Sequence, residues 1–327
     1  MIQPGSSVLT NGYLQKKGDG IMKSTIFYFH GGNSYYLPYS IGQAIKYNSD
    51  SEIVFLGDSS TSYIPQKYPI KYMNFEEYFE ESNRFESLYE HMSPNSYYTE
   101  LKCFQRWITL AEYCDKNTVE GRVVLLDSDV MLYCSLAEYM EQYFKDYDIA
   151  VCGEYGPGYI MFRDRSVCRG LANTIMAYYA DPEKKKLLQA DWEILSKQTT
   201  GDCAISDMKL IDRFIRESGI RKLDLCEVVD GKCFDNHLGK IDDRFPLNPK
   251  TGNKTIIMKQ GIPWCYNVKS GELVQYRSIH FQGGRKEIMY EYYTGDPKYV
   301  PCRAAAIGRK VMQRAKHIVR KYIIRKG

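Results

Sequence analysis

The pattern of apolar and polar positions predicts a chain of alternating strands and helices. Residues Ser24–His30 (STIFYFH) are rich in β-branched and aromatic side chains and predict a first strand. After a Gly-Gly break, residues 34–48 predict a helix, and residues 52–58 (EIVFLGD) predict a second buried strand that ends in a turn. This β-α-β order predicts a parallel sheet, in which ligands bind at the carboxyl ends of the strands.

The rest of the chain keeps this alternation. The further predicted elements are, in order, a helix at 99–114, a strand ending at residue 127, strands at 148–153 and 158–164, a mostly helical stretch at 166–220, and short strands up to 284. No internal repeat or low-complexity linker divides them. We therefore predict an α/β fold with one domain at residues 23–300, a polar extension at 1–22 and a tail at 303–327.

Two aspartates follow the buried strand in the stretch GRVVLLDSDVMLY, which covers residues 121–133. Asp127 and Asp129 flank Ser128, and residues two apart in an extended segment point the same way, so both carboxylates can face one cation. Buried carboxylates are costly without a positive partner, and hard oxygen ligands favour Mg²⁺ or Mn²⁺. The motif predicts a divalent-metal site, although such acid pairs also occur as plain solvated turns.

A second group of polar residues ends a late strand, in the stretch HFQGGRK at residues 280–286. His280 supplies an imidazole, the glycines allow a backbone to approach a phosphate, and Lys286 supplies a mobile positive charge. The segment is equally compatible with a β-turn that carries a basic pair on the surface.

Together the two motifs resemble glycosyltransferase family 8, the group that includes glycogenin and lipopolysaccharide galactosyltransferases. The pattern formed by His280, Gly283 and Lys286 is similar to the family's C-terminal His-x-x-Gly-x-x-Lys motif. The resemblance covers roughly residues 23–290 and implies the GT-A fold, a Rossmann-like, mixed but mainly parallel sheet flanked by helices. It implies transfer of a sugar from a nucleotide diphosphate sugar, such as a UDP-sugar, to a glycan or lipid-linked acceptor.

The resemblance also implies roles for individual residues. In the family, the two D-x-D aspartates and the histidine hold Mn²⁺, while the glycine and the lysine contact the diphosphate. These positions correspond here to Asp127, Asp129, His280, Gly283 and Lys286. The other donor-binding residues that it implies are Gly31, Asn33 and Tyr35 in the loop after the first strand, Arg106 in the helix before the aspartates, and Ser128 between them.

The residues beside the reacting sugar match the family less closely. Where the family has Asp-Gln, the chain has Asp207 followed by Met208, and we expect Asp207 to orient or deprotonate the acceptor. Asp202 and Glu154 are alternative catalytic carboxylates for a reaction with inversion. Asp207 also suits a plain helix N-terminus after Ser206, where a negative charge is favourable. Retention or inversion stays open.

The expected chemistry centres on the leaving diphosphate, on which negative charge builds during transfer. A divalent ion and Lys286 would neutralise that charge. The planar guanidinium group of Arg106, with its several N–H groups, would orient the sugar donor. One imidazole among oxygen ligands favours Mn²⁺ over Mg²⁺.

Composition supports a globular protein, since 44% of the residues are hydrophobic and 29 are tyrosines. The ten cysteines include no C-x-x-C pair, which favours free thiols in a reducing compartment over disulfides or a zinc site. No apolar run reaches 18 residues, and no signal-peptide pattern opens the chain. We therefore predict a cytoplasmic protein.

Charge is concentrated in the tail. Residues 303–327 contain nine Lys or Arg residues and no acidic residue, so the rest of the chain sums to −5 within a total of +4. Apolar side chains recur there every three or four residues, at Ile307, Val311, Ala315, Ile318 and Tyr322. This pattern predicts a basic amphipathic helix on an anionic membrane surface. Packing on its own domain is an alternative, and nucleic-acid binding is disfavoured because aromatic residues are not interleaved with the cations.

Two other functions fit parts of the sequence. A phosphatase of the haloacid dehalogenase class also uses D-x-D after an apolar strand, with Asp127 as nucleophile, Asp129 as acid/base and the pair Asp242 and Asp243 as later acids. That reading gives residues 280–286 no role, and about 126 residues precede a motif that usually opens the chain. A non-enzymatic membrane adaptor would explain the tail but not the buried acids.

Overall fold

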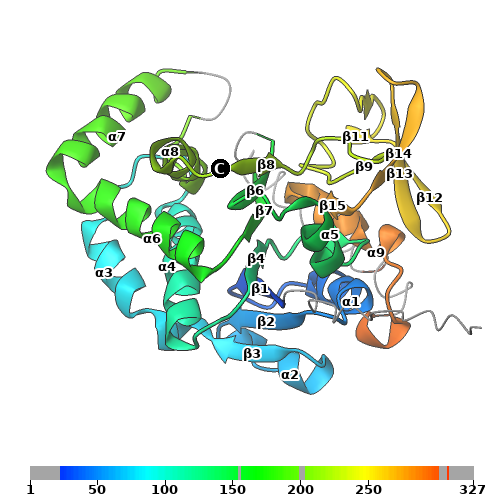
Figure 1. Cartoon of the computed structure of the whole chain (residues 1–327), viewed down its shortest axis with the longest axis horizontal. Coiled ribbons are helices and arrows are strands. Elements are labelled where there is room, and N and C mark those ends of the chain that lie inside the picture. Colours follow the sequence, from blue (N-terminus) through cyan, green and yellow to red (C-terminus); the bar gives the residue numbers. More distant parts are fainter. Residues whose placement is uncertain (1–22, 154–155, 199–202, 302–307, 309–327) are drawn as a thin grey trace, which may run out of the picture.

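The computed structural model of the protein describes residues 23–153, 156–198, 203–301 and 308. Within these residues the chain forms a seven-stranded sheet with helices on both faces and three smaller sheets beside it (Figure 1). The order of the main sheet is β3-β2-β1-β4-β7-β6-β8. In that order its strands span Lys71–Asn74, Glu52–Gly57, Ser24–His30, Arg122–Leu126, Gly156–Phe162, Ile149–Cys152 and Lys222–Asp224.

Among the described strands of the main sheet, β7 alone runs against the rest. β1 pairs in parallel with β2 and β4, β2 with β3, and β6 with β8, whereas β7 is antiparallel to β4 and β6. Successive side chains of a strand point to opposite faces of the sheet, and here both sets are apolar: Ile26 and Tyr28 lie in one hydrophobic cluster and Phe27 in the other. The predicted α/β fold with a mixed, mainly parallel sheet flanked by helices is confirmed.

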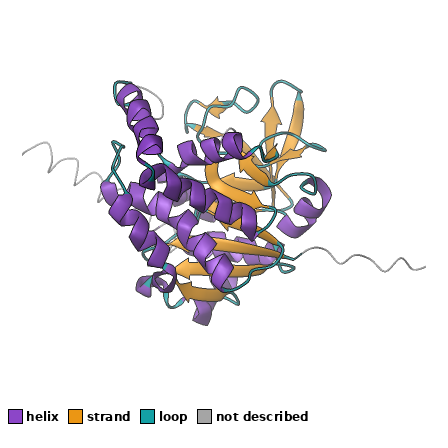
Figure 2. Ribbon diagram, turned by 60° about the vertical axis from the view of Figure 1, so that its left-hand side comes forward, coloured by secondary structure: helices purple, strands orange, loops and turns teal. Residues whose placement is uncertain are grey.

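The helices form two layers. On one face lie α1 (Leu37–Tyr47) and α5 (Leu136–Tyr143), whose apolar residues share the cluster of Ile26. The other face carries the larger helical layer, which lies in front of the strands in Figure 2. Its helices are α3 (Glu80–Leu88), α4 (Tyr97–Lys116), α6 (Arg165–Ala180), α7 (Pro182–Leu195) and α8 (Asp207–Ser218). The short helices α2 and α9 span Ile64–Lys67 and Met289–Tyr292.

Polar residues at the element ends explain where the observed boundaries differ from the predicted ones. α4 begins two residues earlier than predicted because Ser96 caps it, accepting the backbone N–H of Thr99 at 3.3 Å. β2 ends at Gly57, since Asp58 turns to accept the N–H of Ser60. The predicted helical stretch at 166–220 is confirmed as three helices, the last of which ends at Ser218 and is capped by Gly219 with φ of 65°.

The smaller sheets lie at the upper right of Figure 1 and carry the C-terminal half of the site. One has the order β12-β13-β14-β9, with strands Ile256–Lys259, Ile262–Asn267, Glu272–Tyr276 and Lys232–Cys233. A second pairs β10 (Leu247–Asn248) with β11 (Asn253–Lys254), and a third pairs β5 (Val130–Leu132) with β15 (Ser278–His280). The last pairing is antiparallel and sets His280 opposite Val130, one residue after Asp129.

Both predicted terminal segments lie outside the described residues, apart from Gly308 in the tail. The extension at 1–22 and the amphipathic helix at 303–327 therefore stay predictions. In the part of the chain that the structure describes, no helix has both the length and the apolar composition that a membrane span requires.

Candidate metal and donor site

Asp127 and Asp129 lie in a tight turn between β4 and β5. The N–H of Asp127 donates to the carbonyl of Gly158 (2.8 Å), and the N–H of Val130 donates to the carbonyl of Asp127 (3.1 Å). The expectation that an extended segment aligns the two carboxylates is wrong, because a turn brings them together. They still converge: one oxygen of each and one ring nitrogen of His280 all lie within 4.8 Å of one another.

His280 presents to the aspartates a ring nitrogen that makes no hydrogen bond among the described residues. Its Nδ1 is 2.7 Å from the carbonyl of Asn236, and because a carbonyl only accepts, Nδ1 carries the hydrogen. Nε2 lies 3.4 Å from Oδ1 of Asp129 and is a buried atom without a hydrogen-bond partner among the described residues. A buried, unpartnered imidazole nitrogen beside two carboxylates has the donor set of a divalent-metal site, so these residues fit the predicted ion.

Lys286 completes the surroundings of Asp129. Its Nζ lies 3.0 Å from Oδ2 of Asp129 and 5.1 Å from the centre of the Tyr36 ring. The segment Gly283–Ile288 forms a 3-10 helix that begins at Gly283 with φ of 66°, a conformation that favours glycine. Gly283 therefore has a conformational reason to be glycine, and the turn carries Lys286 to the acids.

The surface basic pair considered for residues 280–286 is only half present. Arg285 turns away from the acids and donates to Oδ1 of Asn253 (2.6 Å) and to the carbonyl of Gly252 (2.9 Å). It ties the turn to β11, while Lys286 faces Asp129. The two adjacent cations therefore have different tasks.

Arg106 connects Asp127 to Asp207. One guanidinium nitrogen donates to Oδ1 of Asp127 and the other to Oδ2 of Asp207, both at 2.6 Å. Asp207 is the first residue of α8, as expected for an acid at a helix N-terminus, and also accepts the indole N–H of Trp107 at 2.9 Å. The planar fork of Arg106 thus holds two acids from distant segments in one buried network.

The charges of the site are close to balanced and respond strongly to a cation. Three carboxylates (Asp127, Asp129 and Asp207) face two fixed cations, Arg106 and Lys286. With neutral His280 the sum is −1, so a divalent ion would change it to +1 and make the site attractive to an anionic diphosphate.

The pKa values of the ligand candidates shift in different directions, because burial and the neighbouring charges act against each other. Burial raises the pKa of Asp127 to about 6, against the opposing charge of Arg106. Burial alone would lower the pKa of His280, but Asp129 and Asp127 raise it to about 8. Burial also opposes ionisation of Asp129, but His280 and Lys286 lower its pKa below the ordinary value. A proton on these groups takes the place that a metal ion would take.

The loop after β1 is joined to the metal-site turn through His30. The two ring nitrogens of His30 lie 2.9 Å from Oγ of Ser128 and 3.0 Å from Oγ of Ser34. Ser128 therefore holds the turn against the loop. The N–H of Gly32, next to Gly31, donates to Asp58 at 2.7 Å.

The other two predicted donor residues of this loop line a separate pocket. Oδ1 of Asn33 accepts the hydroxyl of Tyr63 at 3.1 Å, and the ring of Tyr35 meets that of Tyr36 edge-on. The pocket has a volume of about 360 Å³ and is lined by Asn33, Ser34, Tyr35, Pro38, Tyr63, Lys67, Val300 and Pro301. The ring of Tyr36 also lies against Lys286, so the loop borders the ion pair of Lys286 and Asp129.

Several residues of the site escape sequence reasoning. His30, Trp107, Gly158 and Asn236 contact its polar side chains, and the sequence assigned a role to none of the four. His30 offered a weak signal as a histidine that ends a buried strand. Asn236 acts through its backbone carbonyl, which no residue type reveals. The proposed alternative carboxylates Glu154 and Asp202 lie outside the described residues.

Comparisons with known proteins give distant structural similarity. No protein-family model matches the sequence, and no curated protein matches it. The structure is similar to mouse xyloside xylosyltransferase 1, with 9% identity, 64% of this chain and 87% of that chain covered, and a TM-score of 0.42. The bifunctional glycosyltransferase WbbM is 13% identical, and the match covers 88% of this chain and 52% of that chain with a TM-score of 0.43. The chain thus spans about half of that protein. The galactosyltransferase LgtC, solved with donor and acceptor sugar analogues, is 12% identical, and the match covers 84% of this chain and 98% of that chain with a TM-score of 0.41. Similarity at this level assigns no activity to the chain.

Proposed function

We propose that the protein is a metal-dependent glycosyltransferase of the GT-A fold, related to family 8, that takes its sugar from a nucleotide diphosphate sugar. The observation that carries the proposal is the convergence of Asp127, Asp129 and the unpartnered Nε2 of His280, with Lys286 against Asp129. Sugar transfer from such a donor needs positive charge where the diphosphate departs, and these residues would supply it.

Asp127, Asp129 and His280 would hold the ion, which would act as a Lewis acid on the diphosphate. Manganese is the preferred identity because one imidazole accompanies oxygen ligands, and magnesium is the alternative. The ammonium group of Lys286 would contact the diphosphate, either in place of Asp129 or in addition to it, because the lysine side chain is flexible. Gly283 and Ser128 belong to the two turns that carry Lys286 and the aspartates, so we assign them to the diphosphate as well.

On the sugar side we assign Arg106 and Asp207. Arg106 would orient the sugar donor through its guanidinium group. Asp207, which Arg106 and Trp107 hold in place, would orient or deprotonate the acceptor. Asp202 and Glu154 stay alternatives for an inverting base. Gly31, Asn33 and Tyr35 are assigned to the nucleobase end, beside the 360 Å³ pocket. A UDP-sugar carrying a hexose is the donor that the resemblance favours.

The acceptor and the cellular setting rest on the tail. We assign residues 303–327 to an anionic membrane surface and the acceptor to a glycan or lipid-linked glycan in cell-surface polysaccharide synthesis. The protein would then be cytoplasmic and peripherally attached to a membrane, with no nucleic-acid partner.

The phosphatase alternative is less well supported by the geometry. The acids it needs, Asp242 and Asp243, pair with Arg244 and Lys269 and do not join the Asp127 cluster among the described residues. It also leaves the contacts of His280 and Lys286 with Asp129 without a task. The adaptor alternative leaves the same buried charges unexplained.

The test is thermal unfolding of the full chain against a panel of nucleotide sugars, with and without Mn²⁺. We expect one nucleotide sugar to raise the midpoint only when Mn²⁺ is present, by linkage to binding. Phosphatase activity lost in Asp127→Asn, together with no sugar-nucleotide binding, would overturn the proposal in favour of the phosphatase.

A further inference from the structure

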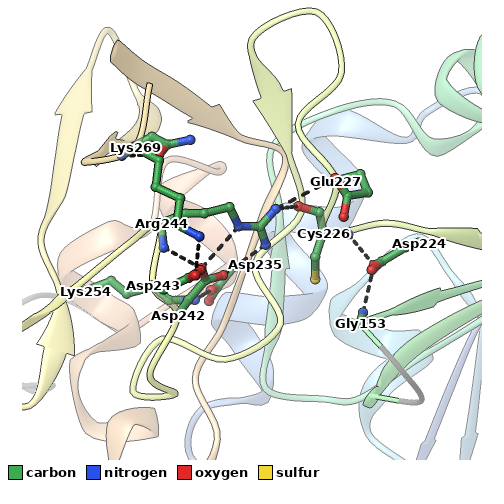
Figure 3. A network of polar contacts seen from close by, with 11 residues as sticks. Gly153, Asp224, Cys226, Glu227, Asp235, Asp242, Asp243, Arg244, Lys254 and Lys269 are labelled. Carbon is green, nitrogen blue, oxygen red and sulfur yellow. Dashed lines mark hydrogen bonds and ion pairs between the residues drawn. The ribbon is translucent and has the colours of Figure 1, made fainter. Parts of the chain in front are cut away.

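A buried ion pair lies behind the metal-site histidine. Nζ of Lys254, in β11, is 2.7 Å from Oδ1 of Asp235, and the side chains of Lys254 and Asp235 are 3% and 0% exposed. Figure 3 shows this pair beside the more accessible pair of Arg244 and Asp242. Removing two charges from water costs about as much as their attraction returns, so a buried pair of this kind is not explained by stability alone.

The second oxygen of Asp235 reaches His280. Oδ2 accepts the backbone N–H of His280 at 3.2 Å, while Oδ1 is occupied by Lys254. The backbone of Asp235 is fixed as well, because its N–H donates to Oγ of Ser278 (3.3 Å) and its carbonyl accepts the hydroxyl of Tyr159 (3.2 Å). The carboxylate therefore has one orientation, and it connects the ammonium to the metal-site strand.

The residues after Asp235 hold the rest of His280. The carbonyl of Asn236 accepts Nδ1–H of the ring (2.7 Å), and the N–H of Leu238 donates to the carbonyl of His280 (3.0 Å). The N–H of Lys254 donates in turn to the carbonyl of Leu238 (2.8 Å). Lys254 thus binds both ends of the segment 235–238: its side chain pairs with Asp235, and its backbone N–H donates to Leu238.

On its other side His280 is fixed by the turn that carries the acids. β15 pairs with β5 so that His280 lies opposite Val130, and the N–H of Phe281 donates to the carbonyl of Asp129 at 2.9 Å. The imidazole therefore lies between the acid turn and the segment 235–238. A shift of that segment would rotate Nε2 away from the carboxylates.

We propose that Lys254 and Asp235 are positioning residues that aim Nε2 of His280 at the metal site. This inference rests on the proposed function, because it concerns the same site. A ligand histidine is commonly oriented by the groups that accept its other ring hydrogen, and loss of such groups weakens metal binding by about 10- to 100-fold. Here the orienting carbonyl of Asn236 is set in place by a buried charge pair one residue away.

The experiment measures the Kd for Mn²⁺ of the full chain by titration calorimetry, well below the unfolding midpoint of each variant. We expect Lys254→Met to weaken Mn²⁺ binding by about 10- to 100-fold. The control is Arg244→Met, which breaks the neighbouring pair with Asp242 (3.0 Å) but removes no hydrogen bond to His280 or to residues 235–238. We expect this variant to keep its Kd within about twofold.

A double-mutant cycle distinguishes positioning from a general loss of structure. In a His280→Ala background, Lys254→Met should cause no further loss of Mn²⁺ affinity, because the residue that it positions is absent. The ¹⁴N modulation of the spin echo from bound Mn²⁺ should be present in the wild type and absent in both single variants. If Lys254→Met weakens binding equally in both backgrounds, or if Arg244→Met matches it, the inference is overturned.

Asp235→Asn/Lys254→Met keeps the inference testable if Lys254→Met alone does not fold, since removing both charges avoids an unpaired buried carboxylate. We expect this double variant to unfold near the wild-type temperature and still to bind Mn²⁺ weakly; wild-type affinity would overturn the inference. If His280→Ala binds Mn²⁺ as the wild type does, the proposed function itself fails. If His280→Ala loses affinity and Lys254→Met keeps it, only the positioning role fails.

Discussion

Gly158 lies against the ring of His280 so closely that a Cβ on Gly158 would be 2.6 Å from Nδ1 of the imidazole. Gly158 stands in β7, next to the end of β4, and its carbonyl also accepts the N–H of Asp127. One residue without a side chain therefore touches both the aspartate turn and the histidine of the candidate metal site.

Gly158→Ala is expected to displace His280 and to weaken Mn²⁺ binding, because neither the backbone of β7 nor the tightly bonded ring can yield without loss. Overpacking of this kind costs about 1–3 kcal/mol, which corresponds to roughly a 5- to 150-fold change in Kd if it falls on binding. Titration with Mn²⁺ measures it. The control is Gly170→Ala in α6, where the Cβ meets only the Phe214 ring at 3.1 Å. Equal affinities of Gly158→Ala and the wild type would contradict the geometry.

The residues with recognisable chemistry could be predicted from the sequence, and those that position them could not. Asp127, Asp129, His280 and Lys286 stand in two motifs whose residue types already point to a metal and a diphosphate, and the structure brings all four together. Asn236 contributes only a carbonyl, a group that every residue has.

The fold shows the same division. Continuous apolar runs predicted β1, β2, β4 and β6, since these strands are buried on both faces. They did not predict that the aspartates form a turn, because that depends on β5 leaving the main sheet to pair with β15, about 150 residues later. Pairing between distant segments is not encoded in local periodicity.

Removing the shared metal carboxylate should abolish transfer. Asp129→Ala is expected to lower kcat/KM at least about 1000-fold and to remove Mn²⁺-dependent nucleotide binding, because Asp129 faces both His280 and Lys286. Circular dichroism and the unfolding midpoint verify that the fold is intact. Unchanged turnover would reject the metal assignment.

The adjacent cations of the C-terminal motif should separate stability from activity. Lys286→Ala is expected to lower transfer about 100-fold with little effect on unfolding, since Lys286 contacts Asp129 alone among the described carboxylates. Arg285→Ala should cost about 0.5–1.5 kcal/mol of stability, because it removes the donor to half-buried Asn253 and to the Gly252 carbonyl, and should keep most activity. Parallel assays and denaturant titrations measure both. The assignment of tasks is wrong if the two variants behave alike.

Arg106 should not tolerate lysine. A lysine has one ammonium and cannot reach Asp127 and Asp207 with a fork, so Arg106→Lys leaves one buried carboxylate unpaired. Breaking a buried pair costs about 3–5 kcal/mol, and we expect a clear loss of stability together with transfer. Arg213→Lys is the matched control, because Arg213 pairs at 2.6 Å with Asp191, which is more exposed. Denaturant unfolding compares the two losses, and a loss no larger at Arg106 would contradict the role of the fork.

Deleting residues 303–327 should separate membrane binding from chemistry. The nine cations of this segment are expected to draw the protein to anionic vesicles, at about 1 kcal/mol for each residue near the surface, so the truncated chain should stay in the supernatant in a sedimentation assay. Phosphatidylcholine vesicles are the control, and binding of the full chain should weaken with added salt because the attraction is screened. Transfer to a soluble acceptor should persist after truncation, since all described site residues precede the tail. Sedimentation of the truncated chain with anionic vesicles would show that the membrane contact lies elsewhere in the protein.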